Sequence, residues 1–315
     1  MNILSVDLGY SLCKVIFEKN NEVKEYICPS AISYAFQKDL EEQENIYHYN
    51  DEYIKIGAVS NDNLDTLNDD FIIKYSPVFL AHVINELKIE KQINETVLLF
   101  GISEINKEIL KDLRKILKSF TVNNKEYAFS DVKIFKQGDI YPLIKNKIDD
   151  FGDLNENVTV LDIGFFTNDI HYYENGILNN NIKISNIFGV NKAIEPINSF
   201  LKDKGLFLSQ QEINQYLNGE KNRFKIRKGK KIIDLSEIIN KSKEIFTNEI
   251  IAILNKKEVI NSDIFCIVGG GAKLLDWEKI NREIGEERIL KYEEDSIYVN
   301  AKTYILNYKN KKDVR

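Results

Sequence analysis

Short apolar runs that end in an acidic residue and a glycine occur once in each half of the chain. Residues 3–9 are Ile-Leu-Ser-Val-Asp-Leu-Gly, and residues 158–164 are Val-Thr-Val-Leu-Asp-Ile-Gly. A short apolar run closed by a turn residue is typical of a buried strand. A third run, residues 264–268, leads into three consecutive glycines. The pattern predicts a strand followed by a tight turn at each of these places.

The same periodicities predict further strands and helices around these turns. Strands are expected at residues 3–7, 13–18, 23–28, 96–101, 132–135, 158–163, 168–174, 177–184 and 264–268. Helices are expected near residues 71–87, 104–118, 140–151, 190–202, 209–218, 234–256, 275–283 and 298–307. Asn175-Gly176 is a strong hairpin signal, whereas the polar segment 36–52 is expected to be an exposed excursion. This mixture of strands and helices predicts an α/β fold.

The length of 315 residues exceeds the usual limit of a single core, so two domains are expected. The polar run at 152–157 separates two segments with a shared order of strand, Asp-x-Gly turn, hairpin and helices. We place the domain boundary at this run. The repeated order predicts a duplicated fold.

Composition narrows the expected partners and compartment. The net charge of −6 disfavours a broad nucleic-acid surface, so any link to DNA is expected to run through another protein. Cys13, Cys28 and Cys266 show no paired spacing, which is typical of a reduced, cytoplasmic protein. The three histidines have no metal-site spacing. Neither a membrane span nor a signal peptide is expected.

The turns suit a phosphate ligand. Glycine lets backbone N–H groups approach a phosphate closely, but an adjacent carboxylate is compatible with phosphate only if a cation is also bound. Because Mg²⁺ keeps most of its waters, Asp7 and Asp162 could hold these waters from opposite domains. Lys14 could reach a phosphate as a point charge. The glycines at 269–271 leave room for a base or sugar against the backbone.

Each feature also has a purely structural interpretation. An Asp-x-Gly turn is common, a glycine run can be only a flexible turn, and a lysine such as Lys14 is more often solvated. Gln137 ends a predicted strand; a neutral glutamine can orient an attacking water, but its local sequence favours an exposed loop residue. The order and spacing of the three turns together favour a nucleotide site.

In this order the motifs resemble those of the actin-like ATPases, the superfamily that also holds sugar kinases and the large heat-shock chaperones. Residues 7–14 are similar to the first phosphate motif, and residues 162–169 to the second. Residues 135–138 resemble the connecting motif, whose polar residue orients the hydrolytic water. Phe188-Gly189 is similar to a nucleotide-contacting turn, and residues 268–272 to the adenosine motif.

The resemblance is closest to the bacterial plasmid-segregation actins, the ParM-like proteins. Residues 9–14 have their Gly-Tyr-Ser-x-x-Lys form. The segments at 208–213 and 228–235, which precede a long predicted helix, are similar to their second domain. Residues 297–301 resemble their Asn-Ala closing helix.

The resemblance implies a duplicated, ribonuclease H-like fold with two domains around a nucleotide cleft. The implied domains are residues 1–152, residues 153–296, and a C-terminal helix at 297–315 that returns to the first domain. The implied ligands are ATP, with GTP as an alternative, and Mg²⁺ held through water by Asp7 and Asp162. Gln137 and Asp162 are the implied catalytic residues. The implied nucleotide contacts are Gly9, Tyr10, Ser11, Lys14, Gly164, Phe165, Phe166, Thr167, Gly189, Gln211, Glu212, Gly270, Gly271 and Ala272.

The implied function is an ATPase that assembles into filaments and segregates plasmid DNA through a small DNA-binding adaptor, without touching nucleic acid or membrane itself. Phe165 and Phe166 depart from the family pattern Asp-x-Gly-Gly-x-Thr, and Thr303 stands where glycine is common. The paired rings motivate one alternative, a cytoskeletal actin that hydrolyses slowly. The other alternative is a small-molecule, sugar-type kinase of the same fold, with Asp139 as its base.

Overall fold

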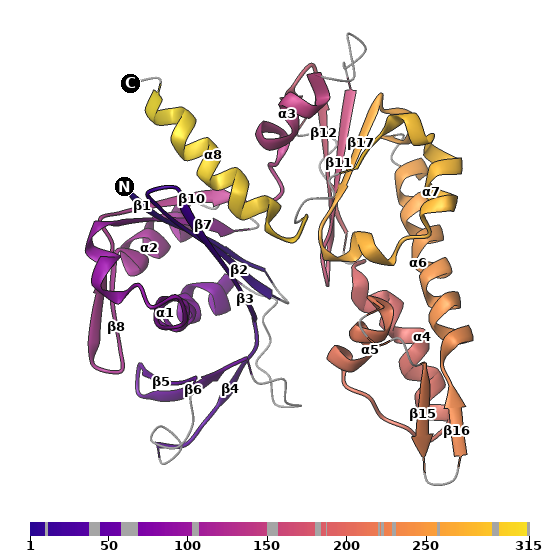
Figure 1. Ribbon diagram of the computed structural model, residues 1–315, viewed down its shortest axis with the longest axis horizontal. Coiled ribbons are helices and arrows are strands. Elements are labelled where there is room, and N and C mark those ends of the chain that lie inside the picture. Colours follow the sequence, from indigo (N-terminus) through magenta and orange to yellow (C-terminus); the bar gives the residue numbers. More distant parts are fainter. Residues whose placement is uncertain are drawn as a thin grey trace. The chain divides into compact units, whose positions relative to one another are not determined.

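The computed structural model of the chain describes residues 1–9, 12–37, 45–57, 69–102, 107–149, 157–179, 184–186, 188–219, 221, 224–228, 231–256, 259–291 and 296–313. The chain divides into two compact units (Figure 1). Unit 1 comprises Met1–Leu143 and Tyr298–Arg315, and unit 2 comprises Ile144–Ile297. The predicted domain boundary at 152–153 lies outside the described residues.

Unit 1 is built on a mixed sheet of order β10-β7-β1-β2-β3. Its strands are β1 (Asn2–Leu8), β2 (Leu12–Lys19), β3 (Glu22–Pro29), β7 (Thr96–Ile102) and β10 (Asp131–Lys136). A smaller sheet contains β4 (Ile32–Tyr34), β6 (Glu52–Ile56) and β5 (Ile46–Tyr49), and β8 (Ser119–Val122) pairs with β9 (Lys125–Ala128). The helices are α1 (Asp69–Leu87), α2 (Lys107–Lys118), α8 (Val299–Asp313) and a 3-10 turn, Glu90–Glu95.

Unit 2 has a sheet of order β13-β12-β11-β17-β18, with β14 also pairing β12. Its strands are β11 (Asn157–Ile163), β12 (Asn168–Glu174), β13 (Ile177–Leu178), β14 (Ile184–Asn186), β17 (Ile264–Val268) and β18 (Ile289–Lys291), and β15 (Lys225–Lys228) pairs with β16 (Lys231–Asp234). Its helices are α4 (Val190–Asp203), α5 (Gln210–Leu217), α6 (Ser236–Lys256) and α7 (Trp277–Ile284). Helix α3 (Tyr141–Asp149) crosses the division between the units. The 3-10 turns are Val259–Asn261, Gly270–Leu274, Glu286–Arg288 and Ser296–Tyr298.

The two main sheets have equivalent strand orders. β1 and β11 each pair with an antiparallel strand on one side, β2 or β12, and with a parallel strand on the other, β7 or β17. Parallel neighbours need a long crossover connection, and in both units the crossover contains helices. The predicted duplicated α/β fold is therefore confirmed.

Alternate side chains of β1 point to opposite faces of the unit 1 sheet. Leu4 and Val6 belong to the buried core that includes residues of α1 and α2. On the other face, the Ser5 hydroxyl donates a hydrogen bond of 2.8 Å to the carbonyl of Ala301 in α8. Successive side chains of a strand point to opposite faces, so Asp7 lies on the face covered by α8 (Figure 1).

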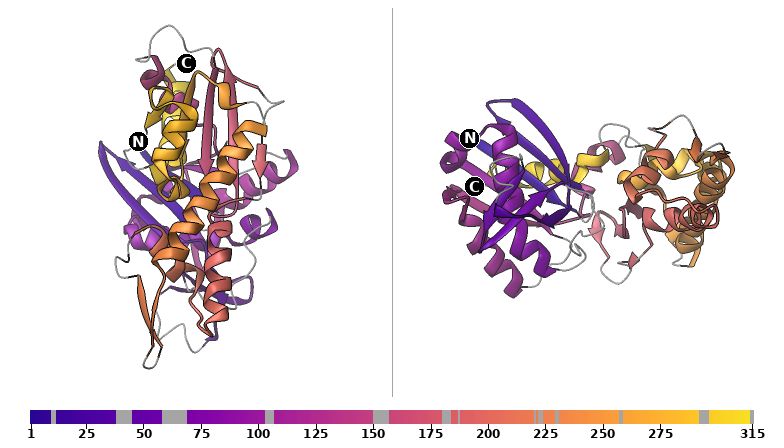
Figure 2. Two further views of the ribbon diagram at one scale, coloured as in Figure 1. Left: turned by 90° about the vertical axis from the view of Figure 1, so that its right-hand side faces the viewer. Right: turned by 90° about the horizontal axis from the view of Figure 1, so that it is seen from below.

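The unit 2 sheet packs its Leu161 and Ile163 side chains against α4 and α6. These helices lie side by side (Figures 1 and 2). The turn between β12 and β13 confirms the predicted hairpin, because Asn175 and Gly176 both have positive φ, 49° and 76°, as a type I′ turn requires. Of the helices in the described ranges, none combines the length and hydrophobicity needed to cross a bilayer.

Two sequence-based predictions need correction. The segment 36–52 is not simply an exposed excursion: Ile46 and Tyr47 in β5 are buried, because the strand pairs with β6 and Tyr47 reaches His82 of α1. The strand expected at 177–184 is instead two short strands, Ile177–Leu178 and Ile184–Asn186, with 180–183 outside the described residues. Hydrophobic periodicity also missed the short strands β4, β6, β8, β9, β15, β16 and β18.

Gly101 in β7 is required by the packing of α8. A Cβ at this position would overlap the ring of Tyr304, which is buried and stacks on Phe135 at a centroid distance of 5.3 Å. We predict that Gly101→Ala lowers the free energy of unfolding by about 1–3 kcal/mol, as overpacking does. Denaturant unfolding measures this loss. The same substitution in a Tyr304→Ala background should cost clearly less, and an equal cost in both backgrounds would contradict the contact.

Candidate functional site

Asp7 is the buried centre of the candidate site in unit 1. It is the penultimate residue of β1, is 1% exposed, and lies opposite Lys14 of β2 and Gly101 of β7 in the strand register. The short loop between β1 and β2 sets this register, because the Gly9 N–H donates a hydrogen bond of 3.1 Å to the Leu12 carbonyl. The hairpin therefore places a lysine directly beside the carboxylate.

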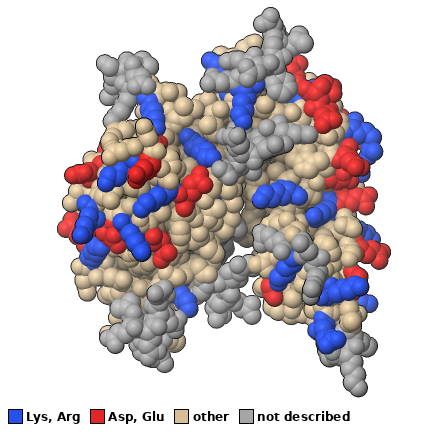
Figure 3. Space-filling model, in the orientation of Figure 1, with Lys and Arg blue, Asp and Glu red and all other residues tan. Residues whose placement is uncertain are grey.

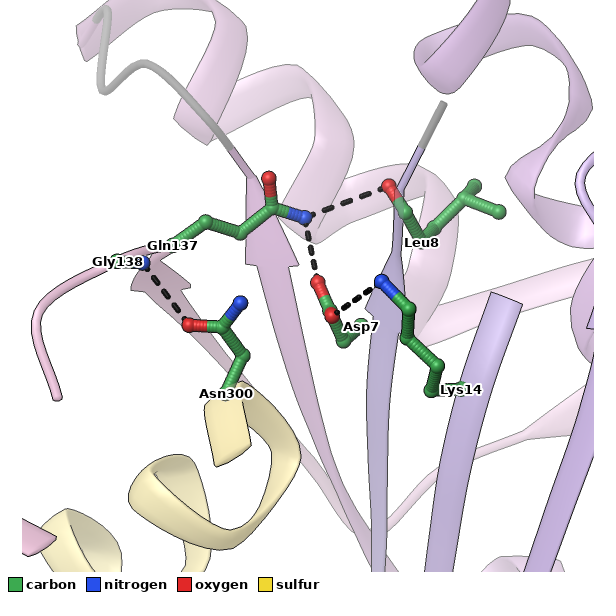
Figure 4. Close-up of polar contacts among 6 residues, drawn as sticks. All are labelled: Asp7, Leu8, Lys14, Gln137, Gly138 and Asn300. Carbon is green, nitrogen blue, oxygen red and sulfur yellow. Dashed lines mark hydrogen bonds and ion pairs between the residues drawn. The ribbon is translucent and has the colours of Figure 1, made fainter. Parts of the chain in front are cut away.

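Both carboxylate oxygens of Asp7 have partners (Figure 4). Lys14 Nζ lies 3.0 Å from Oδ2 and forms an ion pair with it. Gln137 Nε2 donates a hydrogen bond of 2.7 Å to Oδ1 and a weaker one of 3.4 Å to the Leu8 carbonyl. Lys14 of the same hairpin and Gln137, which is 130 positions away in sequence, thus meet at one carboxylate.

Helix α8 fixes the backbone next to Gln137. The Gly138 N–H donates a hydrogen bond of 2.9 Å to Asn300 Oδ1 (Figure 4), and Gly138 has a positive φ of 81°. The Gln137 N–H also donates to the Ile102 carbonyl at 2.9 Å. Sequence reasoning did not place Asn300 in the site, although it noted the Asn-Ala pair of the closing helix. An asparagine in an otherwise apolar helix start is the signal that could have indicated it.

The corresponding turn in unit 2 follows Asp162. The Gly164 N–H donates a hydrogen bond of 2.8 Å to the Thr167 carbonyl. The carbonyls of Gly164 and Phe165 accept hydrogen bonds from Val190 and Asn191, at 3.1 and 2.9 Å, at the start of α4. The turn is thereby attached to the N-terminus of a helix, whose first N–H groups lack partners within the helix.

Glycines allow this turn to approach its neighbours. A Cβ on Gly189 would overlap the backbone of Phe165 and Phe166, and one on Gly271 would overlap Ile163. Gly269 has a φ of 88°, and a Cβ there would overlap Asp162 and Ile163. The structure thus brings together three predicted segments of unit 2: residues 162–167, Gly189 and the glycine turn after β17.

The Phe165 and Phe166 rings contact each other edge to face, with centroids 4.8 Å apart. Phe165 also packs against the hydrophobic core of unit 2. The Phe165 ring thereby anchors the turn to the core.

The position equivalent to Lys14 carries the opposite charge in unit 2. Asp162 lies opposite Asp169 in the register of β11 and β12, as Asp7 lies opposite Lys14 in β1 and β2. Thr167 Oγ1 donates a hydrogen bond of 3.3 Å to Asp169 Oδ2. Unit 1 therefore presents a carboxylate paired with a cation, and unit 2 presents two neighbouring carboxylates.

The remaining residues that were predicted to contact the nucleotide are Tyr10, Ser11, Gln211, Glu212, Gly270 and Ala272. Tyr10 and Ser11 lie outside the described residues. Gln211 lies in α5, and the Glu212 carboxylate accepts hydrogen bonds of 3.0 Å from the N–H and the hydroxyl of Ser209 in a capping box. The backbone bond from Ser209 lowers the pKa of Glu212. Gly270 and Ala272 belong to the 3-10 turn after β17.

The surroundings of Asp7 in unit 1 fit a metal ion that is held through water molecules, and not a metal ion that the carboxylate binds directly. Both oxygens of Asp7 are already engaged, and Mg²⁺ keeps most of its own waters. Within the described ranges, no group of three or more His, Cys, Asp or Glu side chains is arranged to hold a metal ion. Acidic and basic side chains are interspersed on the face of each unit that Figure 3 shows.

Solved structures resemble this chain over almost its entire length. An archaeal actin homologue, Ta0583, has a TM-score of 0.76 and 18% identity, with 99% of this chain and 100% of that chain covered. A ParM from a 15-stranded filament of Clostridium botulinum has a TM-score of 0.73 and 18% identity, with 98% and 99% covered. ParM of Bacillus thuringiensis with ATP has a TM-score of 0.64 and 16% identity, with both chains fully covered. No protein-family model and no curated protein matches the sequence.

The fold is therefore that of the actin-like proteins. The structures of similar shape include an archaeal actin homologue and ParM proteins, as the motifs implied. At these sequence identities the similarity establishes the fold only, and the activity has to be inferred from the residues of the site.

Removing one partner of the Asp7–Lys14 pair should be costly because the pair is largely buried, with side-chain exposures of 2% and 20%. We predict that Lys14→Met lowers the free energy of unfolding by roughly 3–5 kcal/mol, since it leaves a buried carboxylate without its cation. Adding Asp7→Asn should restore part of this loss. Denaturant unfolding measures both effects.

The exposed pair Lys133–Asp131 provides the matched control in the same unit, with exposures of 46% and 48%. Lys133→Met should change stability by no more than about 1 kcal/mol. Equal losses in Lys14→Met and Lys133→Met would contradict a special role for the buried pair.

Proposed function

We propose that this chain binds ATP with Mg²⁺, hydrolyses it, and assembles into filaments in the nucleotide-bound state. The observation that carries the proposal is the convergence of Lys14 and Gln137 on the buried Asp7 carboxylate. A buried charge with a cation and a neutral amide beside it is costly to build for structure alone. It suits a site that handles phosphate and water.

In unit 1, the residues have separable roles. Lys14 binds a phosphate oxygen as a point charge, and it is held for this by Asp7 at 3.0 Å. Gln137 orients the attacking water with its amide, without acting as a strong base. Asn300 is a positioning residue, because it holds the backbone N–H of Gly138 next to Gln137.

In unit 2, the backbone of residues 164–167 binds phosphate oxygens and the Gly269–Gly271 turn lies against the nucleoside. Asp162 and Asp169 form the more acidic half and suit the water shell of a divalent cation. Bound Mg²⁺ would neutralise charge on the phosphates. The remaining predicted contacts, among them Thr167 and Ala272, are proposed on the same basis.

Self-assembly is supported by the likeness to a ParM described as a filament. A subunit that contacts the next one head to tail through different surfaces forms an open filament when its rotation does not close. We further propose a cytoplasmic role in plasmid segregation through a small DNA-binding adaptor. The net charge of −6 supports an indirect link to DNA.

Gln137→Ala tests the water-orienting role. We predict that phosphate release falls roughly 100-fold while nucleotide affinity changes little, because the proposed role of the amide in the reaction is to orient the attacking water and not to bind the nucleotide. Phosphate release and calorimetric titration of a non-hydrolysable ATP analogue measure the two effects. Asp139→Asn is the neighbouring control and should keep wild-type release. A loss in Asp139→Asn, together with transfer of phosphate to a sugar, would favour the kinase alternative.

ATP should trigger assembly of the wild-type chain, seen as a rise in light scattering, and phosphate release should follow. GTP in parallel determines the nucleotide preference. Asp162→Ala should abolish phosphate release because it removes the acidic partner of the cation. Scattering without release in the wild type would favour the slowly hydrolysing alternative. Undiminished release in Asp162→Ala would contradict the role proposed for that carboxylate.

A further inference from the structure

Two of the three cysteines of the chain lie directly opposite each other on neighbouring strands. Cys13 of β2 is paired with Cys28 of β3 in an antiparallel register. Because the Leu12 carbonyl accepts a hydrogen bond from Gly9, which directly follows β1, the polar backbone groups of Leu12 face β1 and those of Cys13 point to β3. Cys13 and Cys28 are thus a hydrogen-bonded pair, for which the Cα atoms are about 5.5 Å apart. That spacing falls within the range of about 4.4–6.8 Å that disulfides require.

The pair is located in a polar corner of the unit 1 core. Cys13 and Cys28 are 0% and 4% exposed and belong to the core covered by α1. His82 of α1 lies in the same corner, with Tyr26 Oη 2.8 Å from its Nε2 and Tyr47 Oη 3.1 Å from its Nδ1. Neither the nucleotide chemistry nor the packing of an apolar core requires this arrangement.

The two thiols differ in reactivity. The hydrogen bond from Cys13 and a further one from His82 lower the pKa of Cys28, although burial opposes them. The pKa of Cys13 is raised, first by its hydrogen bond to Cys28 and then by burial. A thiolate is the reactive form of cysteine. The lowered pKa of Cys28, together with its place near the end of the edge strand β3, makes Cys28 the thiol that reacts first and Cys13 the partner that reacts second.

We propose that Cys13 and Cys28 are an oxidation site, which closes into a reversible intramolecular disulfide when the chain meets hydrogen peroxide. The Cys28 thiolate attacks one peroxide oxygen, which breaks the O–O bond, releases water after proton uptake, and leaves a sulfenic acid. The Cys13 sulfur then attacks the Cys28 sulfur, forms the S–S bond and expels the hydroxyl group as a second water. The two thiols lose two electrons, and the peroxide gains them.

The position of β3 gives the oxidant a route. β3 is the edge strand of its sheet, and Cys28 is its penultimate residue. Strand ends at an edge open more readily than central strands. Cys266 contrasts with this, because it lies in β17 between β11 and β18 and burial raises its pKa to about 12. Cys266 should remain a thiol.

The experiment counts thiols in the full-length chain. Folded protein is treated with a small excess of hydrogen peroxide, quenched, unfolded in an alkylating reagent and weighed by mass spectrometry. The untreated wild type should take up three alkyl groups and the oxidised wild type one. Dithiothreitol should restore three. Cys266→Ser should fall from two to none, and Cys28→Ser should keep both remaining thiols. Cys13→Ser should lose only the Cys28 thiol, which stays as a sulfenic acid that adds the mass of one oxygen and that dithiothreitol reduces.

Several outcomes would overturn the proposal. These are three alkyl groups on the oxidised wild type, a thiol loss in Cys13→Ser or Cys28→Ser equal to that of the wild type, or a peptide map that joins either residue to Cys266 or to a second chain. Thermal unfolding provides an independent readout, since the crosslink restrains the unfolded chain. The Tm of the oxidised wild type should rise by on the order of 5 °C, and that of Cys13→Ser should not change.

Discussion

A carboxylate buried at the end of a central strand must be compensated, and Asp7 is the place where this chain meets that constraint. An unpaired buried charge would cost several kcal/mol, so the lysine opposite it and the amide of Gln137 are both needed. The side chains that compensate Asp7 come from the hairpin of β1 and β2 and from the end of β10. Asn300, at the start of α8, holds Gly138 beside Gln137. These contacts connect β1, β2, the end of β10 and the start of α8 around one buried carboxylate.

The duplicated backbone carries different charges in its two copies. Strand order and pairing are equivalent in both sheets, yet the position across from the strand-end carboxylate is Lys14 in unit 1 and Asp169 in unit 2. The strand pairing specifies where side chains lie, but not which charge they carry. In the proposed function this difference is useful, because a nucleoside triphosphate with its cation presents both negative oxygens and a positive ion. Lys14 in unit 1 suits the negative oxygens, and the neighbouring carboxylates of unit 2 suit the positive ion.

The sequence was most informative where structure is local. The main strands and the Asn175-Gly176 turn follow from apolar runs and turn chemistry, and the approach of Lys14 to Asp7 follows from the hairpin. Contacts between distant segments left no local pattern. Gln137 resembled an exposed loop residue from its neighbours alone, yet it donates to a carboxylate 130 positions away. Tyr47 resembled part of a polar loop, because its partner His82 lies on a helix that follows.

The turn after Asp162 departs from the Asp-x-Gly-Gly-x-Thr pattern of the proteins that the sequence resembles. The usual second glycine permits a tight bend, whereas here Phe165 follows Gly164 and packs against the core with Phe166 at its edge. Gly189 lies against this turn, and a Cβ at Gly189 would overlap the backbone of Phe165 and Phe166. Because α4 also donates to the Gly164 and Phe165 carbonyls, the turn is held on two sides. The Phe165 ring and the first N–H groups of α4 thus hold the turn after Asp162 in place.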